Sequence, residues 1–249
     1  MNHTPKAKQV RVRTNVVLTG FGPFPGVPLN ATMLLIPRLA AAARQVFPAV
    51  DIATEILATE WAAAPLRVDA LLAEHTPDLM IHFGVSAQAR GFEIEQQGRN
   101  TRDLTHDAGG RMPDAAHVRV DGPDQHPSRL PVDAIVHRLR AHDIPAFVSP
   151  NAGAYLCNAT LYHSLAATDP ALCDVGFVHI PASLAPPVVP EPVAHTPGAP
   201  LGTSPGCPLT WAQALAGGLH ILATCLDRPS PGRKVLAQAV TRHGLAGSV

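Results

Sequence analysis

Cys157, His179 and Glu95 are three residues that together could perform nucleophilic catalysis. Attack of a cysteine on a carbonyl requires a thiolate, an imidazole that takes and returns a proton, and an acceptor that orients the imidazole ring. Each residue also has an ordinary structural role. A free cysteine is commonly a small buried hydrophobe, a histidine in an apolar strand is commonly a hydrogen-bonded core residue, and Glu95 could be an exposed strand carboxylate. The spacing alone leaves both interpretations open.

Cys157 is expected in the first turn of a helix that follows a strand. Residues 144–148 form a short apolar run that predicts a buried strand. Pro150 and Gly153 interrupt this run, and a helical pattern begins at about Ala154. Unpaired backbone N–H groups and the positive end of the helix dipole meet in a first turn, and both favour a thiolate.

The other two residues are expected on strands. Residues 174–180 predict a buried strand that closes at His179, and residues 92–97 alternate like an exposed or edge strand that carries Glu95. Three groups with useful chemistry therefore fall at strand ends or at the start of a helix. The sequence does not show whether the fold brings them together.

The rest of the amino-terminal part alternates between strand and helix patterns. Strands are expected at 14–20, 51–59 and 78–84, and helices at about 31–46 and 62–75. This alternation predicts an α/β fold with three layers (α/β/α) around a doubly wound, mostly parallel sheet, with an added antiparallel or edge segment. Binding sites in such folds lie outside the carboxyl ends of the strands.

We expect one α/β domain over residues 1–249. The long polar segment 98–128 is expected to be functional or to contain a hairpin, because structureless loops of that length are uncommon. Helices are also expected at 132–141 and 209–226. The remaining parts are expected to be a mobile basic leader, a Pro-rich surface loop and a loosely attached tail, at 1–13, 182–208 and 228–249 respectively.

Composition excludes several classes of function. Lys plus Arg and Asp plus Glu number 19 each, and this balance gives no support for binding to nucleic acid or to anionic membranes. No apolar stretch approaches the roughly 18 residues that a membrane span requires, and no signal-peptide pattern is present. The four cysteines form no CxxC pair, which favours a cytoplasmic protein with reduced thiols. Among 13 histidines none has a metal-ligand spacing, so neither a metal nor a cofactor is expected.

Four segments resemble the type I pyroglutamyl peptidase family of cysteine peptidases. The resemblance extends over about residues 16–226. It is carried by Gly-Phe-Gly-Pro-Phe at 20–24 with Asn-Ala-Thr at 30–32, by Gly-x-Tyr-Leu-Cys at 153–157, by Phe-Val-His-Ile-Pro at 177–181, and by the looser segment 82–100.

The resemblance implies an exopeptidase that removes an N-terminal pyroglutamyl residue from peptides through a thioacyl-enzyme intermediate. It implies Cys157 as nucleophile, His179 as general base and then acid, and Glu95 as the residue that orients His179. Glu95 fits this role because Asn100 follows it at the family's distance. Glu93 is its rival, because it lies on the same face of the expected strand. A dimer or a tetramer is expected from the same resemblance.

The substrate pocket is also implied by the family. A pyroglutamyl group is a compact lactam that requires apolar walls and a few placed polar groups. By resemblance Phe21 and Phe24 hold the lactam ring, and Asn30 adds a polar contact or caps a helix. The oxyanion is expected to meet a backbone N–H and Arg111, in a segment resembling the family's Arg-apolar-Pro-Asp. An apparent insertion before this segment makes Arg102 the alternative.

Other functions remain open at the level of sequence. One is a cysteine amidohydrolase acting on another lactam or amide, and another is a non-catalytic binder of blocked peptides with the same fold. A dinucleotide-binding module is a remote alternative: residues 20–22 read Gly-Phe-Gly after a strand, but Pro25 replaces the third glycine of the motif and Pro23 removes a backbone donor.

Overall fold

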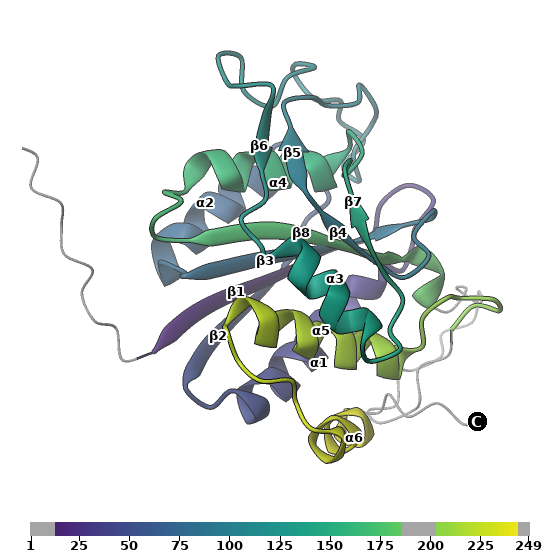
Figure 1. Ribbon diagram of the computed structural model, residues 1–249. Helices are drawn as coiled ribbons and strands as arrows, with labels where there is room; N and C mark the ends of the chain where they lie inside the picture. The colour runs from purple at the N-terminus through teal and green to yellow at the C-terminus, as the bar shows by residue number, and fades with distance from the viewer. Residues whose placement is uncertain (1–12, 186–202, 244–249) are drawn as a thin grey trace, which may run out of the picture.

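A six-stranded mixed sheet forms the centre of the molecule in the computed structural model, which describes residues 13–185 and 203–243 (Figure 1). The strands lie in the order β2-β1-β3-β8-β4-β7. The first four are mutually parallel, whereas β4 runs antiparallel to β8 and parallel to β7. In the same spatial order their bounds are Val50–Leu57, Thr14–Phe21, Leu79–Ser86, Asp174–Pro181, Phe92–Glu95 and Ala146–Ser149.

Helices cover both faces of this sheet (Figure 1). One apolar core packs α1 (Ala31–Val46), α3 (Val132–Arg140) and α5 (Trp211–Cys225) against one face. A second core packs α2 (Ala63–His75) and α4 (Leu156–Ala167) against the other. The predicted three-layer α/β/α architecture, with an antiparallel addition at one edge, is confirmed.

The position of α1 follows from its cap and its apolar face. The side chain of Asn30 accepts a hydrogen bond from the N–H of Thr32 at 3.1 Å and so caps the helix, which is one of the two roles considered for it. Leu35, Ile36 and Leu39 are fully buried against the sheet. The cap also sets where the loop between β1 and α1 ends, and this loop borders the cavity described below.

The antiparallel edge is where the predictions of individual strands were wrong. β4 is an interior strand between β8 and β7, not an exposed or edge strand. Phe92 and Ile94 are fully buried, with Phe92 against α5 at Gly217. β7, expected to be buried, is the actual edge and leaves the Phe147 side chain 40% exposed. The alternation in β4 arises because its polar face lines a cavity and does not face solvent.

The long polar segment does contain the expected hairpin-like pairing. β5 (Gln97–Arg99) and β6 (Gln125–Pro127) form a two-stranded antiparallel ladder that closes the segment at its base. Inside it, Asn100 donates from Nδ2 to the carbonyl of Arg119 at 2.8 Å and accepts from the N–H of Arg119 at 2.9 Å. These bonds anchor the segment beside the strand that carries Glu95.

The terminal and Pro-rich segments are described only in part. Residues 1–12, almost the whole expected leader, and residues 186–202 of the expected Pro-rich loop lie outside the described residues. The expected tail includes a helix that was not predicted, α6 (Arg233–Arg242), which packs on α5 and buries Ala239. Among the described helices, none is long and apolar enough to span a bilayer.

Candidate active site

A cavity of about 520 Å³ opens beyond the carboxyl ends of the parallel strands. Its wall contains Cys157 from the start of α4, His179 from the end of β8, and Glu95 from the end of β4. The loop after β1 contributes Phe21, Phe24 and Asn30. Every residue predicted for catalysis or substrate binding, apart from the arginines, therefore lies at one cavity.

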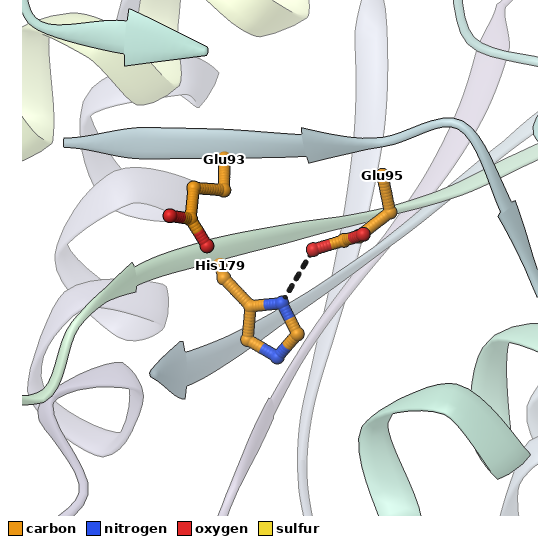
Figure 2. Close-up of side chains that lie close together, drawn as sticks. All are labelled: Glu93, Glu95 and His179. Atoms are coloured by element: carbon orange, nitrogen blue, oxygen red, sulfur yellow. Dashed lines mark hydrogen bonds and ion pairs between the residues drawn. The ribbon is translucent and has the colours of Figure 1, made fainter. Parts of the chain in front are cut away.

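Glu95 and His179 form a buried hydrogen-bonded pair (Figure 2). His179 Nδ1 donates to Glu95 Oε1 at 2.8 Å, and the two residues are 6% and 1% exposed. Glu93 lies directly opposite His179 in the strand register, yet no hydrogen bond joins them within the described residues. The contact to the ring is thus made by Glu95. Because the carboxylate holds the proton at Nδ1, the second ring nitrogen is left for Cys157.

Cys157 completes the arrangement on the other side of the imidazole. The thiol of Cys157 hydrogen-bonds the His179 side chain. Burial lowers the pKa of His179, but the negative charge of a Cys157 thiolate and the hydrogen bonds to Cys157 and Glu95 outweigh burial and raise that pKa to about 10. The site therefore favours a protonated imidazole beside the Cys157 sulfur.

The start of α4 places the Cys157 sulfur at the cavity. Gly153, with φ +80°, turns the chain after β7, and the helix begins at Leu156. Cys157 consequently lies in the first turn, where backbone N–H groups have no partner within the helix. On β3, Gly84 makes room for the sulfur, because a Cβ there would lie 3.0 Å from Sγ and 2.7 Å from the Phe177 ring.

The other cysteines have different surroundings. Burial raises the pKa of the Cys173 thiol to about 11 and that of the Cys225 thiol to about 12. Neither residue, nor Cys207, borders the cavity, and all four cysteines are free thiols. Only Cys157 therefore combines access to the cavity with an imidazole partner among the four.

Aromatic side chains form one wall of the cavity. The ring of Phe24 packs on Tyr155, with centroids 5.9 Å apart, and Tyr155 meets the edge of Trp61 at 5.2 Å. Phe21 is more deeply buried and packs against Phe177. Tyr155 was not identified as a pocket residue from the sequence. Its position two residues before Cys157, at the entrance to the helix, is the signal that could have identified it.

Asn30 lines the cavity but its side chain is already engaged. Oδ1 accepts from the N–H and from Oγ1 of Thr32, and Nδ2 donates to the carbonyl of Gly22 at 3.2 Å. Of the two roles considered for Asn30, the structure shows helix capping. The same bonds tie the loop that carries the two phenylalanines to α1.

The two arginines considered for the oxyanion lie away from the cavity. Arg111 is exposed, in a turn where its N–H donates to Asp107 Oδ1 at 2.8 Å. The Arg102 guanidinium lies 5.9 Å from the Trp61 ring and donates to the carbonyl of Val118. The inserted residues fold around the buried Asp107 and carry Arg111 outward. The role predicted for Arg111 has no geometric support here, and no Lys or Arg of the described residues lines the cavity.

One group of side chains at the cavity has the composition of a metal site. Donor atoms of Glu93, Glu95 and His179 lie within 4.8 Å of one another. A cation bound at Nδ1 of His179 would compete with the hydrogen bond to Glu95, which is already formed. The Glu95–His179 pair therefore fits an imidazole oriented by a carboxylate better than a set of metal ligands.

Comparisons with known proteins agree with this geometry. Residues 14–207 match the family model described as pyroglutamyl peptidase. A pyrrolidone-carboxylate peptidase of Oceanobacillus iheyensis is 32% identical over 170 residues, which are 68% of this chain and 84% of that protein. Pyrrolidone-carboxylate peptidase 1 of Ralstonia nicotianae is 33% identical over 194 residues, covering 74% of this chain and 83% of that protein.

Solved structures show the same fold. A mutant pyrrolidone carboxyl peptidase of Pyrococcus furiosus superposes with a TM-score of 0.67 at 25% identity, covering 86% of this chain and 99% of that chain. Pyroglutamyl peptidase I of Bacillus amyloliquefaciens gives a TM-score of 0.66 over 87% of this chain. With a family model that matches most of its length, this chain belongs to the pyroglutamyl peptidase family.

Proposed function

We propose that this protein is a cysteine exopeptidase that removes an N-terminal pyroglutamyl residue from peptides, with Cys157 as nucleophile. One observation carries this proposal: at one cavity the His179 imidazole contacts the Cys157 thiol on one side and Glu95 on the other. Membership of the family supplies the reaction class. The geometry supports a role for each residue.

In this mechanism the Cys157 proton passes to His179, and the thiolate attacks the carbonyl carbon of the pyroglutamyl peptide bond. The negative charge that develops on the carbonyl oxygen meets the free N–H of Cys157 at the start of α4. His179 returns the proton to the departing amine, which leaves a thioester between the pyroglutamyl group and Cys157. Water, deprotonated by His179, then hydrolyses the thioester and restores the thiol. Glu95 holds the imidazole in one tautomer throughout.

The side chains that line the cavity suit a lactam ring. Phe24 and Tyr155 form an apolar wall. No Lys or Arg of the described residues lines the cavity, so the cavity offers no cation to pair with a carboxylate of a substrate. A pyroglutamyl group carries no charged amine, so it enters such a cavity without the cost of desolvating a charge. We propose peptides with N-terminal pyroglutamate as substrates on these grounds.

Several further properties are part of the same proposal. Four free thiols and a net charge of zero favour a cytoplasmic protein that does not bind nucleic acid. The chain is proposed to act as one domain that assembles into a dimer or a tetramer. The intact Cys157–His179–Glu95 arrangement argues against a non-catalytic binder of blocked peptides. The loop after β1 argues against a dinucleotide site, because Asn30 already caps the following helix.

The decisive experiment is release of a fluorescent coumarin amine from a pyroglutamyl conjugate. The wild-type protein is expected to release coumarin and to be inactivated by iodoacetamide. Cys157→Ser should reduce turnover by at least about 10³-fold, because a hydroxyl is a much weaker nucleophile here.

Cys173→Ser and Cys207→Ser are the matched controls, since neither residue lines the cavity. Both should keep activity within about twofold of wild type. A folded wild-type protein that releases no coumarin would overturn the peptidase assignment. Loss of activity in a control variant, with Cys157→Ser still active, would show that another thiol is the nucleophile.

A further inference from the structure

A second carboxylate lies beside the imidazole of His179. Glu93 is directly opposite His179 in the antiparallel register of β4 and β8, and Glu95 follows two residues later on the same face of β4. Figure 2 shows both carboxyl groups directed toward the ring from the same strand. One donor atom from each of the three side chains falls within a 4.8 Å cluster. Of the two carboxylates, only that of Glu95 hydrogen-bonds the ring among the described residues, so Glu93 requires a separate explanation.

The carboxylate of Glu93 has no direct partner among the described residues. Its side chain is half-buried in the cavity wall and makes no hydrogen bond or ion pair to the described residues. Burial raises the pKa of Glu93, the positive charge of His179 lowers it, and Glu95 raises it further. Because no Lys or Arg among the described residues lines the cavity, the imidazolium of His179 is the cation within reach.

The charges that face His179 come from few elements. From β4 they are Glu93 and Glu95, and from α4 it is the Cys157 thiol. β3 presents Gly84, which has no side chain, and β8 itself presents the uncharged ring of Phe177 at 4.7 Å between centroids. Within the described residues, the ionisable groups that face the imidazole are therefore all acidic.

We propose that Glu93 is a positioning residue that acts on His179 through its charge, and that it extends the pH range over which the imidazolium pairs with the Cys157 thiolate. This inference rests on the proposed function only for its catalytic consequence. Glu95 sets the orientation of the ring by a hydrogen bond, whereas Glu93 contributes charge without contact. Burial raises the pKa of Glu93 overall, and the charge of His179 opposes that rise. Coupling between two titrating groups is mutual, so a charged Glu93 must in turn favour the protonated ring.

The experiment measures the titration of His179 directly. Histidine resonances are followed by NMR between pH 5 and 11, and the His179 signal is assigned by its loss in His179→Gln. Glu93→Gln keeps the shape of the side chain and removes its charge. It is expected to lower the pKa of His179 by about one unit, the size of effect for charges about 5 Å apart in a half-buried site. Glu93→Asp, which keeps the charge, should restore at least half of this shift.

Activity provides the second readout. In Glu93→Gln the alkaline limb of the kcat/KM profile should move down by the same amount as the His179 titration, while kcat at the optimum changes less than about threefold. Glu95→Gln should instead lower kcat at all pH values, because the ring loses its orienting bond. Asp133→Asn, at an exposed position of α3, is the control for removal of a surface charge and should match wild type.

Two results would overturn the inference. One is a His179 titration that is unchanged in Glu93→Gln. The other is a shift that Glu93→Asp fails to restore, since that pattern indicates altered packing and not charge. The NMR measurement needs no turnover, so the expected shift in a protein without peptidase activity would overturn the proposed function and leave the charge effect on His179 standing.

Discussion

At the scale of single residues, side chains that are close neighbours in the sequence have different positions at the cavity. Tyr155 and Cys157 are separated by one residue, yet the first forms the aromatic wall and the second carries the sulfur beside His179. The Tyr155 ring is held from two sides, by Phe24 and by the edge of Trp61, and its hydroxyl donates to the carbonyl of His106 at 3.2 Å. It is thus a rigid surface for an apolar ring.

Tyr155→Ala should therefore raise KM for a pyroglutamyl substrate by about tenfold, because an aromatic contact is worth about 0.5–1.5 kcal/mol beyond its buried area. The value of kcat should fall much less, since the Cys157–His179 contact is untouched. Steady-state kinetics measure both constants. Tyr155→Phe, which keeps the ring, is the matched variant and should remain close to wild type. An unchanged KM in Tyr155→Ala would mean that the substrate does not contact this wall.

At the scale of elements, the site depends on the close approach of α4 to β3 and β8. Gly84 lies in register with His179, and its missing side chain leaves space for the Cys157 sulfur and the Phe177 ring. The approach of the Cys157 sulfur to the His179 ring thus depends on a backbone position on a third element. Helix α4 is buried along nearly its full length, so it has little freedom to move away.

Gly84→Ala is expected to destabilise the fold by about 1–3 kcal/mol, the usual cost of overpacking, and to lower kcat/KM by about 10²-fold. The added methyl group would displace the sulfur or the Phe177 ring, and either movement disturbs the imidazole contact. Urea denaturation and the coumarin assay measure the two effects. Gly232→Ala, where a new Cβ meets nothing within 4 Å, is the control. Wild-type kinetics in Gly84→Ala would contradict the proposed packing constraint.

At the scale of the whole molecule, three buried histidines give the fold a defined pH dependence. Burial, and to a smaller degree His163, lowers the pKa of His82 to about 3, and its ring bonds Thr19 and Ser164 in the neutral form. Burial, followed by the positive charges of His142 and Arg138, lowers the pKa of His220 to about 4. Each of these two rings must remain neutral for the native packing to persist.

Stability is therefore expected to fall on both sides of about pH 6.5. His82 and His220 are protonated more readily in the unfolded chain than in the folded one. Their contribution to the free energy of unfolding is therefore complete above pH 6.5 and is lost as the pH drops toward 4. The loss is up to about 1.4 kcal/mol per pH unit for each residue. His179, whose pKa is raised to about 10, behaves in the opposite way: its contribution is complete below pH 6.5 and is lost as pH rises toward 10.

Urea denaturation at pH 4.5, 6.5 and 8.5 measures these slopes. His220→Leu should flatten the acid side, because it removes a buried group for which neither ring nitrogen has a hydrogen-bond partner among the described residues. His137→Leu, at an exposed position on α3, should leave the curve unchanged. An acid slope that persists at full size in His220→Leu would show that His220 does not contribute to it.

The sequence by itself determined the fold class, the presence of a polar cap before α1 and the segment that carries Cys157. These depend on local patterns: apolar runs for buried strands, a polar cap before a helix, and a glycine where the chain turns. The family resemblance, carried by local motifs, likewise identified His179. The prediction that residues 92–97 form an exposed or edge strand was wrong. Alternation of polar and apolar residues indicates a polar face, but it does not show whether that face meets solvent or a cavity.

Only the tertiary structure decided which carboxylate bonds the imidazole. Glu93 and Glu95 lie on the same face of β4, because side chains on a strand repeat every two residues. The spacing to Asn100 favoured Glu95 by resemblance, but the contact itself depends on how β8 packs beside β4, where Glu93 is opposite His179 and Glu95 makes the bond. The outward position of Arg111 has the same origin, since it follows from a turn around Asp107 whose partners are distant in sequence. Long-range pairing decides such contacts because it is set by the packing of whole elements.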